Sequence, residues 1–192
     1  MSIQNRRERE RAEREQLIVT AARELAETEG WDSVTTRRLA AEIEYSQPVL
    51  YSHFKGKDAI MAAVAVQGCA ELATELRAAR AAARGAGDAL AAVAETYTSF
   101  GRRRPALYDA MFTYLVDLPF ATPEAPEPLQ AAFREILLAV EPIAMTDDDP
   151  GLLTETFWAA LHGLVTLMRS GRLPEGGHEE RLRLLIAHFT TP

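Results

Sequence analysis

Apolar residues recur at intervals of three and four positions along most of the chain, which is the spacing of one face of an α-helix. The first such face runs from Leu17 through Ile18, Ala21 and Leu25, and Gly30 follows it as a helix C-cap. No stretch alternates apolar and polar residues over more than a few positions, as a half-buried strand would. The pattern therefore predicts an all-α fold.

The same periodicity predicts six more helices in the second part of the chain. They cover residues 57–84, 88–103 (capped by Asp88), 105–116, 128–140, 152–170 and 178–189. Between them, four prolines within residues 118–128 predict a loop. The helix at 152–170 is apolar on more than one face, so we expect it to be buried on more than one side.

Residues 34–57 carry two helix start signals eleven positions apart. Thr35 and Ser46 are both good N-cap residues, and each lies between apolar residues at the spacing of a hydrophobic staple. The signals predict two short helices, at roughly 36–43 and 47–52, joined by a tight turn. This is the helix-turn-helix layout, in which the second helix enters the DNA major groove.

Pro48 falls in the first turn of this second helix, where its missing N–H is tolerated. Because proline also biases the preceding residue away from helical geometry, either Ser46 or Gln47 is the cap. The exposed candidates for base contacts are Gln47, Pro48, Val49 and Ser52. Gln47 can pair bidentately with adenine, and Pro48 or Val49 can touch a thymine methyl group. At the start of the next helix, Lys57 and the free N–H groups favour a phosphate.

This stretch resembles the DNA-binding signature of the TetR family of bacterial transcriptional regulators. The matching residues are Thr35–Thr36, Leu39–Ala40, Ser46, Leu50–Tyr51, His53–Phe54 and Lys57. The resemblance implies phosphate contacts for Tyr51 and His53. The predicted DNA-binding set is Thr35, Thr36, Arg37, Ser46, Gln47, Pro48, Val49, Tyr51, Ser52, His53 and Lys57.

The chain departs from the family pattern at Glu44, where the turn usually has glycine. A left-handed conformation costs a non-glycine residue roughly 1–2 kcal/mol. Glu44 also places a negative charge near the DNA.

A second, less specific resemblance lies in residues ~100–190. The motif that begins at Trp158 and ends in His162-Gly163 is similar to a TetR subgroup named for its Trp-His-Gly element. It implies that the middle helices bind a small-molecule effector, although an ordinary core position is the alternative for each residue alone. For His162 the alternatives are a hydrogen bond to the ligand and one between helices. The candidate residues are Tyr97, Tyr108, Met111, Phe112, Leu115, Phe157, Trp158, Leu161, His162 and Val165.

The resemblance also implies a homodimer, formed by the last two helices of each copy. Two-fold symmetry would place the two recognition helices about 34 Å apart, over an inverted-repeat operator. The predicted domains are 1–56, for DNA binding, and 57–192, for ligand binding and dimerisation.

The net charge of −7 is unusual for a DNA-binding protein, but it is unevenly distributed. Residues 1–57 carry ten basic and ten acidic side chains, so the acidity belongs to the remainder of the chain. Residues 5–15 alternate arginine and glutamate without an apolar face. One interpretation is an arm that reaches the DNA minor groove or phosphates. The other is a solvated, frayed extension, and the near balance of charges favours this second interpretation.

These features predict a ligand-responsive transcriptional regulator, most simply a repressor. The alternative is a helical dimeric ligand-binding module without sequence-specific DNA binding, and Glu44 is its best argument. An enzyme has little support, because four scattered histidines and one cysteine suggest no catalytic group.

We predict no cofactor, and no metal site, since Asp147–Asp149 lacks the spacing of a calcium loop. No secretory signal or membrane span is predicted, and the single Cys69 is compatible with the cytoplasm.

Overall fold

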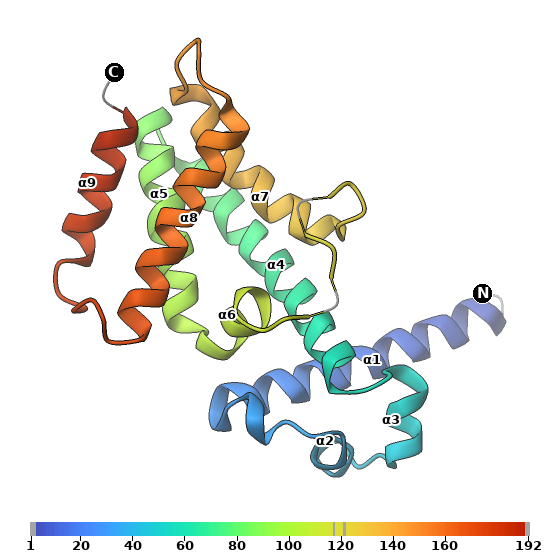
Figure 1. The fold of residues 1–192 in the computed structure, drawn as a ribbon. Helices are drawn as coiled ribbons and strands as arrows, with labels where there is room; N and C mark the ends of the chain where they lie inside the picture. Colours follow the sequence, from blue (N-terminus) through green and yellow to red (C-terminus); the bar gives the residue numbers. More distant parts are fainter. Residues whose placement is uncertain (1–2, 117, 121, 191–192) are drawn as a thin grey trace. The chain divides into compact units, whose positions relative to one another are not determined.

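The computed structural model describes residues 3–116, 118–120 and 122–190. These residues form helices and loops without any strand, which confirms the predicted fold class (Figure 1). The α-helices are α1 (Ile3–Glu29), α2 (Thr36–Glu42), α3 (Gln47–His53), α4 (Lys57–Ala82), α5 (Ala86–Arg103), α6 (Pro105–Phe112), α7 (Glu127–Val140), α8 (Pro150–Arg169) and α9 (His178–Thr190). Two short 3-10 helices are η1 (Trp31–Ser33) and η2 (Glu141–Ile143).

The chain divides into two compact units. The N-terminal unit comprises the residues up to Gly68 together with Arg104–Glu124, so it includes α1 to α3, the first part of α4, and α6. The C-terminal unit comprises Cys69–Arg103 and the residues from Ala125 onwards. The division differs from the predicted boundary at residue 57 because α6 belongs with the helix-turn-helix and α4 contributes to both units.

In the N-terminal unit, α1 packs against α2, α3, η1 and α6. Its core contains Ile18, Leu39 and Leu50, each fully buried. Trp31 is also buried, and its indole nitrogen donates a 2.8 Å hydrogen bond to the carbonyl of Ala106. This bond attaches the start of α6 to η1 within the N-terminal unit.

A second attachment of α6 comes from Glu27 on α1. Its carboxylate accepts hydrogen bonds from the backbone N–H groups of Ala106 (3.1 Å) and Leu107 (3.0 Å). The first N–H groups of a helix have no partner within the helix and carry partial positive charge, so a carboxylate stabilises them. Glu27 therefore caps α6 from a distant part of the sequence.

In the C-terminal unit, α5 packs against α7, α8 and α9, and these helices lie side by side in Figure 1. Glu135 of α7 is buried and binds Arg77 (2.8 Å) and Arg80 (2.7 Å) of α4. Burial alone would raise the pKa of Glu135, but hydrogen bonds from both guanidinium groups outweigh it and lower the pKa below its ordinary value. The carboxylate is thus an ionised link between α4 and α7.

Three predicted helix boundaries are wrong. Residues 5–15 are helical rather than frayed, because α1 begins at Ile3 and pairs such as Arg11–Glu15 support it. Asp88 lies inside the first turn of α5 and is not its cap. The helix predicted at 105–116 ends at Phe112, where the chain turns towards the proline-rich loop.

Within the described part of the chain, α4 is a helix long and apolar enough to cross a membrane by length and composition, although the sequence pattern suggested no such segment. Its apolar residues form protein core: Ile60 and Val64 in the N-terminal unit, and Leu72 and Leu76 in the C-terminal unit, are at most 1% exposed. A core helix meets the same criterion, so α4 is not evidence for a membrane protein.

Candidate functional site

The helix-turn-helix forms where the two cap signals predict it. The Thr35 side chain accepts a hydrogen bond from the backbone N–H of Arg38 (3.2 Å) and so caps α2. Ser46 occupies the N-cap position of α3 with extended backbone, although its side chain makes no capping bond. This settles the choice between Ser46 and Gln47, and Pro48 lies in the first turn as expected.

The turn between α2 and α3 is closed by a Schellman motif, and Glu44 is its left-handed residue. The N–H of Tyr45 bonds the carbonyl of Ala40 (2.8 Å), and the N–H of Glu44 bonds the carbonyl of Ala41 (3.3 Å). Glu44 has φ 57° and is the one non-glycine residue with positive φ in the described ranges. Glycine is the usual residue at this position, so this turn is strained by its sequence.

One face of α3 is open to solvent. Gln47, Pro48 and Ser52 are exposed, as are the larger side chains of Val49 (38% exposed) and Tyr51 (52% exposed). Leu50 is fully buried and anchors the opposite face. The Tyr51 hydroxyl lies 3.3 Å from that of Thr36, so α2 and α3 are linked across the motif. The residues predicted to contact bases thus share one accessible surface.

Two of the residues predicted to contact phosphate, His53 and Lys57, have partners within the fold. The His53 side chain is 6% exposed, and its Nδ1 lies 3.4 Å from the Glu15 carboxylate of α1. The Lys57 ammonium donates to the carbonyl of Trp31. These bonds hold α1 and η1 against the motif, which motif position alone did not indicate. Contact of either side chain with phosphate stays a prediction, and it would compete with these internal bonds.

The two adjacent arginines of α2 differ in their availability. Arg38 binds Glu29 through two hydrogen bonds, one of them 2.7 Å long, and the guanidinium lowers the pKa of the Glu29 carboxyl. Arg37 is exposed and makes no hydrogen bond or ion pair with the residues that the structure describes. Arg37 is therefore the available cation on this helix for a phosphate.

The ten predicted effector-binding residues divide between the two units. Tyr108 and Met111 are buried in α6, in the N-terminal unit. Phe112 ends α6 and packs edge-on against Tyr108, with ring centroids 4.9 Å apart. Leu115 is 103% exposed, because α6 ends before it. It has no core role in the described structure.

The other six residues belong to α5 and α8. Four are fully buried, namely Tyr97, Phe157, Leu161 and Val165. Trp158 donates a 2.8 Å hydrogen bond to the Tyr97 hydroxyl, which joins α8 to α5 within the unit. These contacts fit the alternative of an ordinary core, and an effector role stays a prediction.

Both predicted roles of His162, a hydrogen bond to the ligand and one between helices, stay predictions. Its Nε2 lies 3.4 Å from the Thr166 hydroxyl, one turn further along α8. Burial lowers the pKa of His162, and the nearby positive charge of Arg169 lowers it further. The imidazole is therefore biased towards its neutral form, which can both donate and accept a hydrogen bond.

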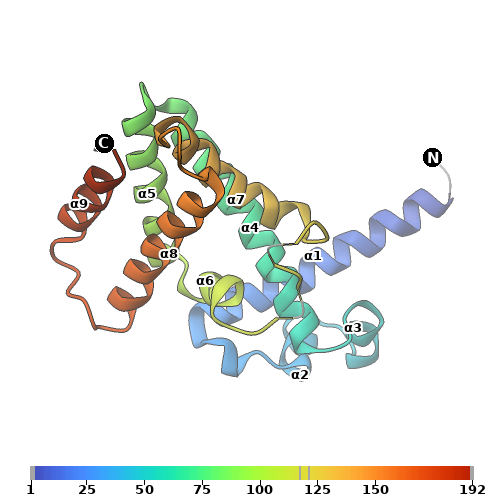
Figure 2. The ribbon, with the colours of Figure 1, turned by 45° about the horizontal axis from the view of Figure 1, so that its top comes forward.

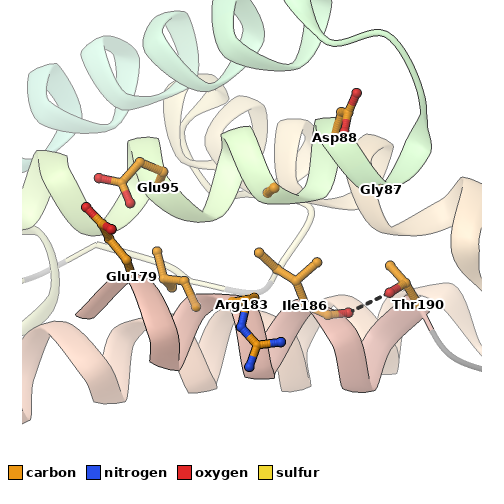
Figure 3. Close-up of a pocket in the computed structure, with 9 residues that line it drawn as sticks. Gly87, Asp88, Glu95, Glu179, Arg183, Ile186 and Thr190 are labelled. Carbon is orange, nitrogen blue, oxygen red and sulfur yellow. Dashed lines mark hydrogen bonds between the residues drawn. The ribbon is translucent and has the colours of Figure 1, made fainter. Parts of the chain in front are cut away.

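A groove of about 510 Å³ separates parts of α5 and α9 (Figure 3). Figure 3 shows Glu95 of α5 and Glu179 of α9 near one end of the groove and Asp88 of α5 near the other. None of the predicted effector-binding residues lines it. No sequence signal pointed to this groove, because both helices have an ordinary amphipathic pattern.

The fold and the exposed α3 face define the class of protein: a helix-turn-helix regulator with a second, helical unit. Residues 18–64 match the model described as "Bacterial regulatory proteins, tetR family". Residues 90–189, more than half of the chain, match the model described as "Tetracyclin repressor-like, C-terminal domain". The chain belongs to the TetR family of DNA-binding transcriptional regulators. Membership in the Trp-His-Gly subgroup stays a prediction.

Three similar proteins show how far the likeness extends. An uncharacterised HTH-type transcriptional regulator of Mycobacterium tuberculosis, Rv0681, is 29% identical over 80% of this chain and 69% of its own length. The class D tetracycline repressor of Escherichia coli is 44% identical over only 26% of this chain and 23% of its own length. A solved structure of a Rhodococcus sp. RHA1 protein of unknown function has a TM-score of 0.74 at 23% identity, covering 92% of this chain and 93% of that one.

Proposed function

We propose that this protein is a homodimeric repressor that leaves an inverted-repeat operator when a small apolar or amphipathic molecule binds. The observation that carries the proposal is the exposed face of α3 on a capped helix-turn-helix. Gln47 and Val49 are both exposed on that face. An amide that can pair with adenine beside an apolar group that fits a thymine methyl suits base recognition in the major groove.

Dimer formation is supported by apolar side chains on the last two helices. Leu152 (62% exposed) and Leu167 (40% exposed) of α8 and Leu184 (46% exposed) of α9 remain accessible in the single chain. An isologous contact between two copies would cover such residues on both. The same two-fold axis would set the two α3 helices about one DNA turn apart, near 34 Å.

Coupling between effector and operator is proposed to pass through α6. This helix is attached to α1 through Glu27 and to η1 through Trp31, and it lies against α4 at Gly68. A Cβ atom at Gly68 would lie 2.6 Å from the Met111 sulfur, so the two helices are in close contact there. An effector that displaced α6 would therefore push both α1 and α4. A hundred-fold loss of operator affinity needs about 2.7 kcal/mol of coupling.

The test is selection of random duplex DNA by the purified protein, followed by the salt dependence of binding to the enriched sequence. An enriched inverted repeat, with affinity falling steeply as salt rises, is the expected result. Compounds that stabilise the protein are then tested for release of this operator. If a folded dimer enriches no sequence, the alternative of a ligand-binding module without sequence-specific DNA binding, which Glu44 favours, replaces this proposal.

A further inference from the structure

The first half of α1 forms a charged helical arm beyond the core of the N-terminal unit. We define the N-terminal arm as residues 4–16, which are all exposed except the partly exposed Glu15. The first buried residue of α1 is Ile18. Figures 1 and 2 both show α1 running on past α3 towards the N-terminus. An apolar partner does not explain this arm, because its residues are almost entirely polar or charged.

The arginines of the arm lie on different faces of the helix. Arg7, Arg11 and Arg14 follow one another at i, i+4 and i+7, which places them on one line along the helix. We call these three residues the arginine line. The same spacing continues from Arg14 to Ile18 and then to the buried Leu25. The arginine line thus extends the face with which α1 packs on the rest of the unit, and no glutamate of the arm falls on it.

The remaining arginines of the arm lie on other faces and have partners. Arg6 lies 3.7 Å from Glu10, and Arg9 also has an interaction partner. On the arginine line, Arg11 is held by Glu15 at 2.8 Å. Arg7 and Arg14 make no hydrogen bond or ion pair with any described residue. The arm is nearly neutral as a whole, but its unpaired cations share one face.

The arm is positioned relative to the recognition helix by Glu15. This carboxylate lies 3.4 Å from Nδ1 of His53, the last residue of α3, so α1 crosses that end of α3 at Glu15. At 1.5 Å per residue, Arg7 lies about 12 Å beyond this crossing along the helix axis. Each strand of duplex DNA has a phosphate about every 3.4 Å. An arm of this length that lay along the duplex would reach phosphates beyond the site that α3 would contact.

We propose that the arginine line binds the phosphate backbone flanking each operator half-site, as a DNA contact separate from α3. The proposal rests on the proposed function for its operator, but it concerns affinity and footprint rather than base recognition. Phosphate contacts carry no sequence information, so the arm would lengthen the bound site without adding specificity. Arg7 and Arg14 supply the charges, and the Arg11–Glu15–His53 contacts hold the arm at α3.

The experiment compares the variant R7Q/R14Q with the matched control R6Q/R9Q, which removes the same charge from other faces of the same helix. Each lost phosphate contact lowers the slope of log affinity against log salt by about 0.9. We therefore expect R7Q/R14Q to lower the slope by about 1.8 for each engaged arm, and R6Q/R9Q to leave it nearly unchanged. R7K/R14K, which keeps the charge, should restore most of the slope. Circular dichroism verifies that each variant keeps its helix content.

Binding is measured on the operator with long flanks, on the operator trimmed to its half-sites, and on random-sequence duplex. Trimming the flanks should weaken the wild-type protein much more than R7Q/R14Q, because the variant lacks the two unpaired charges that contact the flanks. Equal salt slopes for the two double variants would overturn the arm proposal while leaving operator recognition intact. Failure of the wild-type protein to select any operator would instead overturn the proposed function, and the slopes on random duplex would still test the arm. If no duplex binds, both proposals fail.

Discussion

The indole nitrogen of Trp31 and the carbonyl oxygen of Ala106 are joined by a 2.8 Å hydrogen bond between residues 75 positions apart in the chain. Together with the Glu27 carboxylate, which bonds two N–H groups at the start of α6, it builds this helix into the DNA-binding unit. A short helix of eight residues has little intrinsic stability. Its position therefore depends on these contacts with α1 and η1.

Replacing Glu27 with alanine should weaken this attachment. It removes a charge-assisted acceptor from two backbone donors, and we expect a loss of about 1–3 kcal/mol in the free energy of unfolding. Urea denaturation measures the change, with Glu24→Ala on the exposed side of the same helix as the control. If α6 couples effector and operator, E27A also responds less to effector while binding the operator normally. Equal stability of E27A and E24A would contradict the capping role.

Glu44 gives a second prediction, which separates backbone strain from charge. Glu44→Gly relieves the left-handed conformation and should raise the free energy of unfolding by about 1 kcal/mol. Glu44→Gln keeps the strain but removes the negative charge, so its stability should stay close to that of the wild type. Both variants should bind DNA more tightly if the charge repels phosphate. Tighter binding by E44G alone would assign the effect to the turn conformation instead.

The close approach of α4 and α6 predicts a specific steric effect at Gly68. A Cβ atom there would lie 2.6 Å from the Met111 sulfur and 2.8 Å from a Leu107 methyl carbon. Gly68→Ala should therefore destabilise the protein by about 1–3 kcal/mol. Gly163→Ala is the control, because its Cβ would meet nothing within 4 Å and alanine favours a helix. Because Met111 is itself buried, the contact is tested with a double-mutant cycle: G68A combined with Met111→Ala should lose less stability than the sum of the two single losses, and additive losses would contradict the contact.

His178 predicts how the stability of the C-terminal unit depends on pH. The ring is 6% exposed, its Nε2 lies 3.1 Å from the Thr98 hydroxyl, and its Nδ1 has no partner among the described residues. Burial lowers the pKa of His178 below 6.5, Glu95 and Glu179 oppose the shift, and Arg102 and Arg181 add to it. As pH falls, His178 therefore takes up a proton at a higher pH in the unfolded chain than in the folded protein.

The free energy of unfolding contributed by His178 is consequently complete above pH ~6.5 and declines below it, by at most about 1.4 kcal/mol per pH unit. The pKa of His162 is also lowered, so this residue makes the stability depend on pH in the same direction. The wild type must therefore be compared with a His178→Gln variant at each pH, so that the contribution of His178 is isolated. The difference between the two proteins should shrink as the solution is acidified from pH 8 to 5. A difference that grows over this range would mean that the folded state binds the proton more tightly.

Local sequence signals predicted the part of this structure that depends on neighbouring residues. The Thr35 cap, the paired staples and Pro48 indicated both helices of the motif to within a residue or so, because caps and turns are set by local hydrogen bonds. The departure at Glu44 pointed to a left-handed turn, and the structure has one there.

Contacts between distant segments could not be predicted in the same way. Glu27 has the sequence context of any exposed helical glutamate, and only the return of the chain at α6 gives it a role. Likewise, Lys57 and His53 fit phosphate contacts by motif position, but their partners in the fold are Trp31 and Glu15. The assignment of α6 to the N-terminal unit follows from such contacts, and the helical pattern of residues 105–116 contained no sign of it.

The most direct test of operator recognition by α3 compares the sequences selected by the wild type with those selected by Gln47→Ala. If Gln47 contacts a base, the variant should lose preference at one position in each half-site, at a cost of about 1–3 kcal/mol. Its salt slope should remain that of the wild type, since no phosphate contact is removed. Selection of the same sequence with the same preference at every position would show that this face of α3 does not contact the bases through Gln47.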